Sequence, residues 1–328
     1  MLKGKTFLIT GGTGSFGNTL AKKLISTDVS QVIIFSRDEA KQHFMKQEIP
    51  DPRVRYILGD IRDEGSVKKA LSGVDFVFHA AALKQVPASE SFPWEFVKTN
   101  VQGSHNLLNC LAGSNVSNAV FLSTDKAVYP LNAMGMTKAM MEKLVRSEDY
   151  PSATTSVVTR YGNVIGSRGS VIPQFIESIK QTGEVSVTDL QMTRFMMSLD
   201  QSVDLVLFAL ANGGQGDLFV QKSPAATVET IVNALSILMS REIIKTNLIG
   251  IRPGEKTHET LLTSEERSLA IEHEKYFQVK KRLGSESIVI KESNSHSEYT
   301  SENTDILNPE QLANMLSSIP YIKNSIKH

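Results

Sequence analysis

Three reactive side chains stand together near the middle of the chain, in the segment Leu122-Ser123-Thr124-Asp125-Lys126. Apolar residues precede them, so a strand is expected to end where the hydroxyl, the carboxylate and the ammonium begin. A carboxyl group and an amine side by side are able to exchange protons when their surroundings move their pKa values. Thr124, Asp125 and Lys126 are therefore the first candidate catalytic residues, with acid–base chemistry as the expected role.

A second candidate group follows in the segment Met134-Gly135-Met136-Thr137-Lys138. Residues 133–146 have the spacing of an amphipathic helix, in which positions 134 and 138 lie on one face. The ammonium of Lys138 is expected to lower the pKa of a neighbouring acid. A thioether does not exchange protons near neutral pH, so Met134 belongs to this candidate catalytic group but is not expected to be its base.

The N-terminal stretch has the spacing of a phosphate-binding turn. The apolar residues 7–9 lead into Gly11, Gly14 and Gly17, and residues 18–25 have a helical pattern. Gly11 permits a tight turn, Gly14 lets a pyrophosphate approach the backbone, and the helix N-terminus offers its N–H groups to phosphates. The alternative is an ordinary glycine-rich turn. The residues expected to bind a dinucleotide here are Gly11, Thr13, Gly14, Ser15, Phe16 and Gly17, with Lys138 reaching the ribose and the nicotinamide.

Strand-like and helical patterns alternate through the first half of the chain. This alternation predicts an α/β fold, a Rossmann-type doubly wound parallel sheet, in which ligands bind beyond the carboxyl ends of the strands. We expect a cofactor-binding domain over residues 1–165, joined by returning elements from roughly 194–222, and a smaller, mainly substrate-binding C-terminal domain over 166–328. The expected strands are 7–9, 31–36, 54–58, 75–79, 119–123 and 155–161, and the expected helices are 18–25, 38–48, 64–71, 94–111 and 133–146.

The loop after the second expected strand bears on the choice of cofactor. Ser36 and Arg37 end that strand and Lys41 follows one helical turn later, a setting that favours the 2′-phosphate of NADP over the ribose hydroxyls of NAD. The alternative is an arginine on a solvated helix start. After the third strand, Asp60 and Ile61 are expected to hold the adenine edge, while Asp60 taken alone fits a helix N-cap equally well.

The loop after the fourth expected strand contains Ala80, Ala81 and Ala82, followed by Lys84. Its small residues would let the backbone lie close to the cofactor, and Lys84 is placed to meet a charged or hydroxylated substrate. Alanines also favour helix, but two prolines nearby argue for a loop.

Composition limits the class of protein. The chain has 328 residues, enough for one or two domains, and its 35 basic and 35 acidic residues suggest neither nucleic acid nor an anionic membrane as a partner. A single cysteine, Cys110, excludes an internal disulfide and fits a reducing cytoplasm. We expect no signal peptide, no membrane insertion, because no apolar run reaches the roughly 18 residues that a span needs, and no metal site, because no ligand spacing is present.

Taken together, the motifs resemble an extended short-chain dehydrogenase/reductase. Within that superfamily the chain is similar, from about Lys5 to the early 260s, to the UDP-N-acetylglucosamine 4,6-dehydratases of the polysaccharide-biosynthesis group that invert C5. The resemblance rests on the segments Arg160-Tyr161-Gly162-Asn163-Val164, Ser167-Arg168-Gly169-Ser170-Val171-Ile172-Pro173, Met192-Thr193-Arg194-Phe195 and Arg252-Pro253-Gly254-Glu255-Lys256, besides those above. It implies NADP as cofactor, UDP-N-acetylglucosamine as substrate, a role in capsule, O-antigen or lipopolysaccharide synthesis in the cytoplasm, and a homo-oligomer such as a hexamer.

One position departs from the superfamily pattern, which has tyrosine where this sequence has Met134. One reading is a dead reductase that retains only cofactor binding. The inverting dehydratases, however, resemble this chain in having methionine here, and in them the lysine of the Ser-Thr-Asp-Lys segment performs the proton chemistry. The resemblance therefore favours an active dehydratase.

The second half is expected to bind the nucleotide sugar. Three loop arginines, at 168, 194 and 252, suit a diphosphate, although each alone is more often a surface ion-pair partner. Tyr161 is as readily a core residue as a contact, and the serine-rich segment 284–305 is expected to be a long loop or lid that could reach a neighbouring subunit. The expected substrate-binding residues are Lys84, Asn163, Arg168, Gly169, Ser170, Val171, Thr193, Arg194, Arg252 and Glu255.

The expected mechanism is an internal oxidation, elimination and reduction of the sugar. Lys126 is the expected main base, Asp125 the acid at the C6 hydroxyl, and Thr124 the partner of the 4-hydroxyl, with Lys84 contributing a proton at C5. Lys126 must then be partly neutral, which we expect burial, the nicotinamide and Lys138 to favour and a proton shared with Asp125 to permit. The alternatives are a C5-retaining dehydratase, a UDP-sugar 4-epimerase and a non-catalytic NADP-binding regulator.

Overall fold

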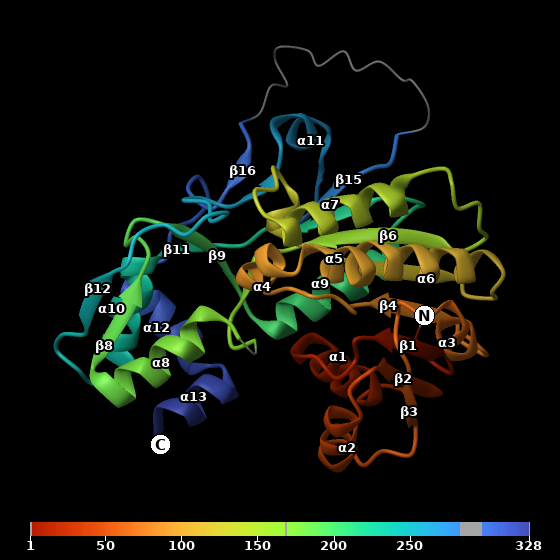
Figure 1. The fold of residues 1–328 in the computed structure, drawn as a ribbon, viewed down its shortest axis with the longest axis horizontal. Helices are drawn as coiled ribbons and strands as arrows, with labels where there is room; N and C mark the ends of the chain where they lie inside the picture. Colours follow the sequence, from red (N-terminus) through yellow and green to blue (C-terminus); the bar gives the residue numbers. More distant parts are fainter. Residues whose placement is uncertain (1, 168, 283–296, 328) are drawn as a thin grey trace.

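The computed structural model describes residues 2–167, 169–282 and 297–327. Within them, one sheet of nine strands organises the molecule (Figure 1). All strand pairs from β10 to β3 are parallel, and two antiparallel strands extend the β10 edge. The Rossmann-type α/β fold expected from the sequence is thereby confirmed. The spatial order is β14 (Ile271–Glu272), β15 (Tyr276–Val279), β10 (Leu218–Gln221), β6 (Thr155–Arg160), β5 (Asn118–Leu122), β4 (Phe76–His79), β1 (Thr6–Thr10), β2 (Gln31–Ser36) and β3 (Val54–Leu58).

Helices cover both faces of this sheet, and the strands are accordingly apolar on both sides. In β1, Leu8 belongs to the buried cluster on one face, while Phe7 and Ile9 belong to the cluster on the other. One cluster is closed by α1 (Ser15–Ile25), α2 (Glu39–Glu48) and α9 (Leu199–Asn212), and the other by α3 (Glu64–Ala70), α6 (Gly103–Ala112) and α7 (Ala133–Arg146).

The segment from Val86 to Ala112, in which the sequence predicts one long helix over 94–111, consists of several helical pieces. It runs through α4 (Val86–Ser91), α5 (Pro93–Phe96), a π-helical stretch (Val97–Gln102) and then α6. The π-helical stretch widens the helix by one residue per turn and so turns Asn100 to a position that a regular helix would not give it. Helical periodicity in the sequence does not reveal such a change.

A smaller lobe lies beside the carboxyl ends of the parallel strands (Figure 1). It has an apolar cluster of its own, to which Ile176, Leu235 and Leu316 belong. Two strands of the lobe, β8 (Glu184–Val187) and β12 (Lys245–Leu248), pair in parallel. Its helices are α8 (Val171–Thr182), α10 (Val228–Leu238), α12 (Pro309–Ser317) and α13 (Pro320–Lys327).

Short strands connect the lobe to the large sheet. A three-stranded sheet contains β11 (Ala225–Thr227), β9 (Thr193–Met197) and β7 (Asn163–Val164), and β13 (Thr260–Leu262), which precedes α11 (Ser264–Leu269), pairs with β16 (Tyr299–Thr300). Residues 284–296 of the expected loop or lid lie outside the described residues. For residues 299–301 the expectation of a loop is wrong, because β16 pairs with β13 and Ser301 is completely buried.

Elements from the later half of the chain return to the large sheet. α9 and β10 come from the expected returning segment, whereas β14 and β15 were not predicted from the sequence. The domain boundary at residue 165 stays a prediction. Among the described residues, none of the helices combines the length and the apolar character that crossing a bilayer requires.

Candidate active site

The glycine-rich turn between β1 and α1 is shaped by close backbone contacts. Gly11 has φ of 65°, and a Cβ there would lie 2.7 Å from the main chain of Ala81. A Cβ on Gly17 would lie 2.4 Å from the carbonyl oxygen of Gly12, so the third glycine lets the helix pack on the turn. Gly14 begins α1 with no side-chain cap among the described residues. This uncapped N-terminus fits the pyrophosphate of a dinucleotide.

The ends of β2 and β3 bring together the residues expected around the adenosine. Arg37 is half-exposed, and its Nη1 lies 3.8 Å from Oδ2 of Asp60. Asp60 accepts hydrogen bonds from Nε and Nη2 of Arg62, at 3.0 and 2.7 Å, and although burial opposes the charge these bonds hold its pKa below the ordinary value. Ser36 is buried, Ile61 is buried beneath Gly103, and Lys41 pairs with Asp38 at the start of α2.

One of the two sequence interpretations of Asp60 is wrong. The N-cap of α3 is Asp63, which accepts hydrogen bonds from the backbone N–H groups of Gly65 and Ser66. Asp60 precedes that helix by several residues and is held by Arg62 instead, which the sequence analysis did not single out. Its carboxylate therefore stays a candidate for the adenine edge.

Asn100, which the sequence analysis missed, fixes the loop of small residues after β4. Its Oδ1 accepts a hydrogen bond from the backbone of Leu83 at 2.8 Å, and its Nδ2 donates to the carbonyl of Leu83 and to Oγ1 of Thr137, both at 3.0 Å. The loop that contains Ala80, Ala81 and Ala82 is thus tied to α7. The π-helical stretch supplies this contact, so no sequence signal could have found it.

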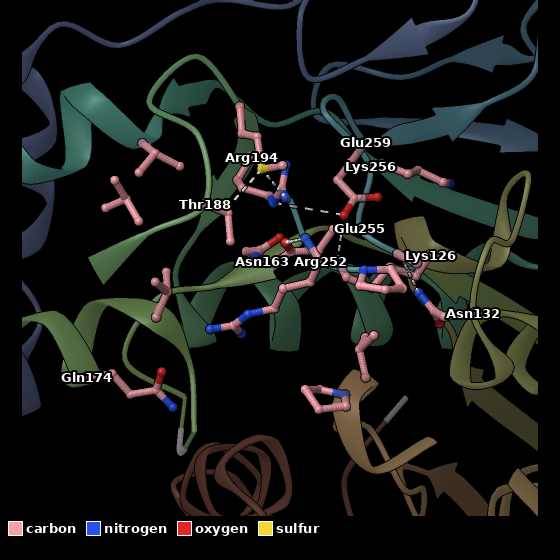
Figure 2. Close-up of a pocket in the computed structure, with 18 of the residues that line it drawn as sticks. Lys126, Asn132, Asn163, Gln174, Thr188, Arg194, Arg252, Glu255, Lys256 and Glu259 are labelled. Carbon is pink, nitrogen blue, oxygen red and sulfur yellow. Dashed lines mark hydrogen bonds and ion pairs between the residues drawn. The ribbon is translucent and has the colours of Figure 1, made fainter. Parts of the chain in front are cut away.

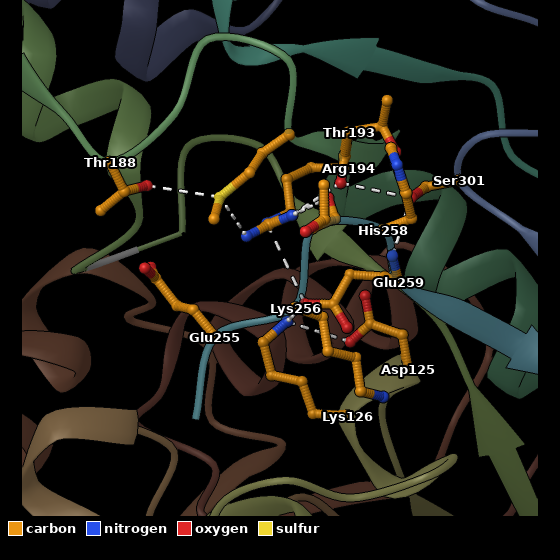
Figure 3. Close-up of polar contacts among 12 residues, drawn as sticks. Asp125, Lys126, Thr188, Thr193, Arg194, Glu255, Lys256, His258, Glu259 and Ser301 are labelled. Carbon is orange, nitrogen blue, oxygen red and sulfur yellow. Dashed lines mark hydrogen bonds and ion pairs between the residues drawn. The ribbon is translucent and has the colours of Figure 1, made fainter. Parts of the chain in front are cut away.

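The Thr-Asp-Lys group lies where β5 ends, as the sequence predicts. Oγ1 of Thr124 donates to Oδ1 of Asp125 at 2.8 Å, and Nζ of Lys126 lies 3.2 Å from the same oxygen. Asp125 is fully buried, and its Oδ2 has no hydrogen-bond partner among the described residues. Figure 3 shows Asp125 and Lys126 beside a further carboxylate, that of Glu259.

Glu259 is the principal residue of this group that sequence reasoning missed. Its Oε1 lies 2.9 Å from Nζ of Lys126 and 4.0 Å from Nε of Arg194. The side chain is buried, and Oε2 has no partner among the described residues. The only sequence feature that pointed to Glu259 was its position three residues after the Arg252–Lys256 motif, next to the apolar run that forms β13.

The second carboxylate changes the electrostatics of Lys126. Burial works against its charge, but Asp125 and Glu259 together raise the pKa of Lys126 to about 12. Burial and then Glu259 raise the pKa of Asp125, against the effect of Lys126. The expectation of a lowered pKa at Lys126 is therefore wrong for this arrangement of residues. The cation that opposes its charge is Arg194, and not Lys138 as expected.

Met134 and Lys138 lie one turn apart on α7, as the helical spacing predicts. Both are buried, and Nζ of Lys138 lies 3.3 Å from the sulfur of Met141. Burial lowers the pKa of Lys138 to about 8, against the attraction of Glu142. Lys138 therefore holds its proton less tightly than Lys126 does.

A cavity of about 490 Å³ opens in front of Lys126 and reaches into the smaller lobe (Figure 2). Among its lining residues, Lys126, Asn163, Val171, Arg194, Arg252 and Glu255 were expected at the site, and Glu259 was not. Apolar side chains of α8 and α10, such as Phe175 and Ile231, line the far part. A cavity of this size, with a few polar groups and an apolar wall, suits a nucleotide-sized ligand.

Other expected substrate residues are placed differently. Thr193 is buried, and its hydroxyl contacts Nδ1 of His258 at 2.8 Å and Oγ of Ser301 at 2.6 Å. Lys84, Gly169 and Ser170 are not among the cavity-lining residues, and Arg168 lies outside the described residues. Tyr161 packs against the apolar cluster beneath α1 and α9. Within the described part of the chain, no cluster of three or more metal-ligating side chains occurs.

Comparison with known proteins adds three findings. The model of the polysaccharide biosynthesis protein family matches residues 7–281. A Rickettsia massiliae protein named UDP-glucose 4-epimerase is 44% identical over 347 residues, with 100% of both chains covered. The X-ray structure of Pen from Bacillus thuringiensis has a TM-score of 0.89 and 35% identity, covering 97% of this chain and 99% of that one. The fold is shared with DesIV, a dTDP-glucose 4,6-dehydratase of Streptomyces venezuelae solved with NAD, at a TM-score of 0.71 and 23% identity over 77% and 86% of the two chains.

Proposed function

The chain belongs to the polysaccharide biosynthesis protein family, and on that premise we propose that it is a UDP-N-acetylglucosamine 4,6-dehydratase that inverts C5. As a member of the nucleotide-sugar epimerase and dehydratase class, it needs groups that move protons beside the hexose. The observation that supports the proposal best is Lys126, which lines the cavity and contacts two buried carboxylates while a methionine occupies position 134. The same proposal includes a role in surface polysaccharide synthesis and a homo-oligomeric state.

We propose NADP as the cofactor. The uncapped N-terminus of α1 and the close approach of the 80–82 loop to Gly11 fit a dinucleotide. Arg37, half-exposed at the end of β2, supports recognition of a 2′-phosphate, since a guanidinium binds phosphate oxygens with two parallel hydrogen bonds. When bound, the nicotinamide supplies a hydride acceptor for C4 and later a hydride donor for C6.

The chain's own residues then move the protons. Lys126 passes a proton to Asp125, with which it is in contact, and the resulting amine takes the proton of the 4-hydroxyl. The ammonium releases this proton to solvent, and the regenerated amine then takes the proton from C5. The protonated Asp125 gives its proton to the C6 hydroxyl, which leaves as water. Thr124 holds the 4-hydroxyl and is itself oriented by Asp125. Inversion follows when C5 is protonated from the opposite face, a proton that we assign to Lys84, which precedes the cavity-lining Val86 by two residues.

A UDP-sugar 4-epimerase is the second candidate, because the Rickettsia massiliae protein has that name. A 4-epimerase needs a base for the 4-hydroxyl but no acid at C6. It would not use Asp125 as an acid at C6, although this residue is buried and its pKa is raised, as an acid requires. The arrangement of side chains therefore favours the dehydratase.

Incubation of the enzyme with UDP-N-acetylglucosamine and NADP tests the proposal. Mass spectrometry should find a product lighter by one water, and NMR in deuterated solvent should find deuterium at C5 and the L-arabino configuration. A product of unchanged mass with inverted C4 would show an epimerase, and a D-xylo product would show a retaining dehydratase. No product from this or other UDP-sugars would indicate a non-catalytic protein.

Lys126→Ala tests the role of the lysine. We expect product formation to fall by about 100-fold or more, as for loss of an acid–base group, while NADP affinity stays the same. Lys143→Ala is the matched control, since Lys143 is an exposed lysine of α7 that does not line the cavity. An active Lys126→Ala variant would overturn the assignment.

A further inference from the structure

Glu259 has no task in the mechanism described so far, yet it lies at the centre of the site. Its Oε1 is 2.9 Å from Nζ of Lys126, closer than the 3.2 Å that separates Nζ from Asp125. Glu259 also lines the cavity, whereas Asp125 is completely buried behind Lys126. Burial of a carboxylate costs free energy unless a cation compensates its charge, so we expect Glu259 to have a function at this position.

The main chain holds Glu259 rigidly in this place. Its N–H donates to Oγ of Ser301 at 2.9 Å, and its carbonyl accepts a hydrogen bond from the backbone of Ser301 at 2.8 Å. Ser301 in turn contacts Thr193 in the neighbouring strand β9. Figure 3 shows Ser301, Thr193 and His258 gathered on one side of Glu259, with Lys126 and Asp125 on the other. These bonds, which continue the pairing of β13 with β16, fix the main chain from which the carboxylate reaches Lys126.

The charges around Lys126 come from four other residues in three segments of the chain. Asp125 follows β5, Arg194 lies in β9, and Lys256 and Glu259 precede β13. With Lys126 included, the group has two carboxylates and three cations, so its positive and negative charges nearly cancel. Without Glu259, one carboxylate would face three cations, and Asp125 would be held as an anion that binds no proton.

We propose that Glu259 is a positioning residue whose fixed negative charge holds the ammonium of Lys126 at the cavity and lets Asp125 share a proton with it. This inference rests on the proposed function for its catalytic meaning. Glu259 itself stays ionised, because its contacts with Lys126 and Arg194 outweigh burial and lower its pKa. The proton moves only between Nζ of Lys126 and Oδ1 of Asp125: the N–H bond breaks, an O–H bond forms, and no other reactant is needed.

The first test measures the charge state of Lys126 without relying on activity. The full-length protein is treated with acetic anhydride over a range of pH, and acetylation of the peptide that contains Lys126 is quantified by mass spectrometry. In Glu259→Gln we expect the midpoint of labelling to move down by about 1 to 3 pH units, as loss of a close opposite charge predicts. Glu259→Asp keeps the charge and should stay close to the unaltered protein.

Two results would overturn the inference. One is an unchanged midpoint in Glu259→Gln, and the other is a Glu259→Asp variant that shifts as far as Glu259→Gln, which would assign the effect to shape and not to charge. Thermal unfolding and NADP binding check that both variants fold. Since labelling does not depend on turnover, it decides the inference even if the protein forms no 4-keto sugar.

The second test uses turnover once product has been observed. The pH profile of kcat should shift to lower pH in Glu259→Gln, and its maximum should fall by about 10-fold or more, while Glu259→Asp recovers most of the rate. A merely structural role would lower kcat equally at every pH and leave the profile in place, which would contradict the proposal.

Discussion

The proposed preference for NADP over NAD depends on one side chain, that of Arg37. It lies at the carboxyl end of β2, and its nearest charged partner is Asp60 at 3.8 Å, a distance too long for a hydrogen bond. Arg62 has taken the close contacts with Asp60 instead. The guanidinium of Arg37 therefore remains available for a phosphate on the adenosine ribose.

Replacement of this arginine is expected to weaken NADP binding selectively. A hydrogen bond to a charged group contributes about 1.5 to 3 kcal/mol, so Arg37→Ala should raise the Kd for NADP by about 10- to 100-fold and change the Kd for NAD little. Arg55→Ala, an exposed arginine in β3, is the matched control. Calorimetric titration of both dinucleotides measures the effect, and equal losses for NAD and NADP would contradict it.

At the scale of elements, the pairing of β13 with β16 joins the C-terminal part of the chain to the active site. Ser301, directly after β16, is completely buried, and its hydroxyl accepts from the N–H of Glu259 and contacts Thr193. The main chain of Glu259 is thus held by a residue more than forty positions away in the chain. Polar residues in such a buried place must be hydrogen-bonded, which makes the contact specific.

Ser301→Ala is expected to damage both stability and activity. The substitution leaves a buried N–H without its acceptor, which costs about 1 to 3 kcal/mol of unfolding free energy, and it loosens the carboxylate that holds Lys126. Urea unfolding and turnover of UDP-N-acetylglucosamine measure the two effects. Ser317→Ala, an exposed serine at the end of α12, should change neither. Full activity in Ser301→Ala would show that the serine network does not position Glu259.

At the scale of the whole molecule, a buried network of ion pairs links the large sheet to helices α7 and α11. Arg160 in β6 donates to both oxygens of Glu142 in α7, at 2.8 and 2.6 Å, and to Glu266 in α11 at 2.7 Å. Ser123, one residue before the Thr-Asp-Lys group, donates to the same carboxylate of Glu142. The network therefore holds the end of β5, and with it the candidate catalytic residues, against two helices.

The network makes a prediction about stability at low pH. Burial opposes the charge of Glu266, but Arg160 lowers the pKa of this carboxyl below its ordinary value of 4.5. A carboxyl with a lowered folded-state pKa stabilises the fold above its unfolded-state pKa, and this contribution is lost as the pH falls through the folded-state value. The free energy of unfolding should therefore be flat near neutral pH and fall below about pH 4.5.

Glu266→Gln isolates this contribution. We expect a loss of about 3 kcal/mol at pH 7, the lower end for breaking a buried ion pair, because Arg160 keeps Glu142. The acid limb of the stability curve should also become less steep. Chemical unfolding between pH 3 and 8 measures both effects, with the exposed Glu310→Gln as control. An unchanged acid limb would exclude Glu266 as a source of the pH dependence.

Local patterns were sufficient for the elements that depend on local interactions. The sequence alone revealed the apolar runs of strands buried on both faces, the glycine spacing before α1 and the helical period of α7. Each of these patterns arises from residues that are neighbours in the sequence. The same holds for Thr124, Asp125 and Lys126 at the end of β5. By contrast, β14, β15 and β16 are short, and β15 and β16 depend on partners far along the chain, β10 and β13, so their own residues do not predict them.

Sequence by itself determined the class of fold, the dinucleotide turn and the identity of the lysine at the site. Only the tertiary structure decided the charge of that lysine, because the carboxylate of Glu259 and the guanidinium of Arg194 reach it from β-strand regions distant in the sequence. Motif spacing records which residues are close along the chain. Electrostatic effects depend on distance through space, and here the nearest charge comes from Glu259, 133 positions away in the sequence.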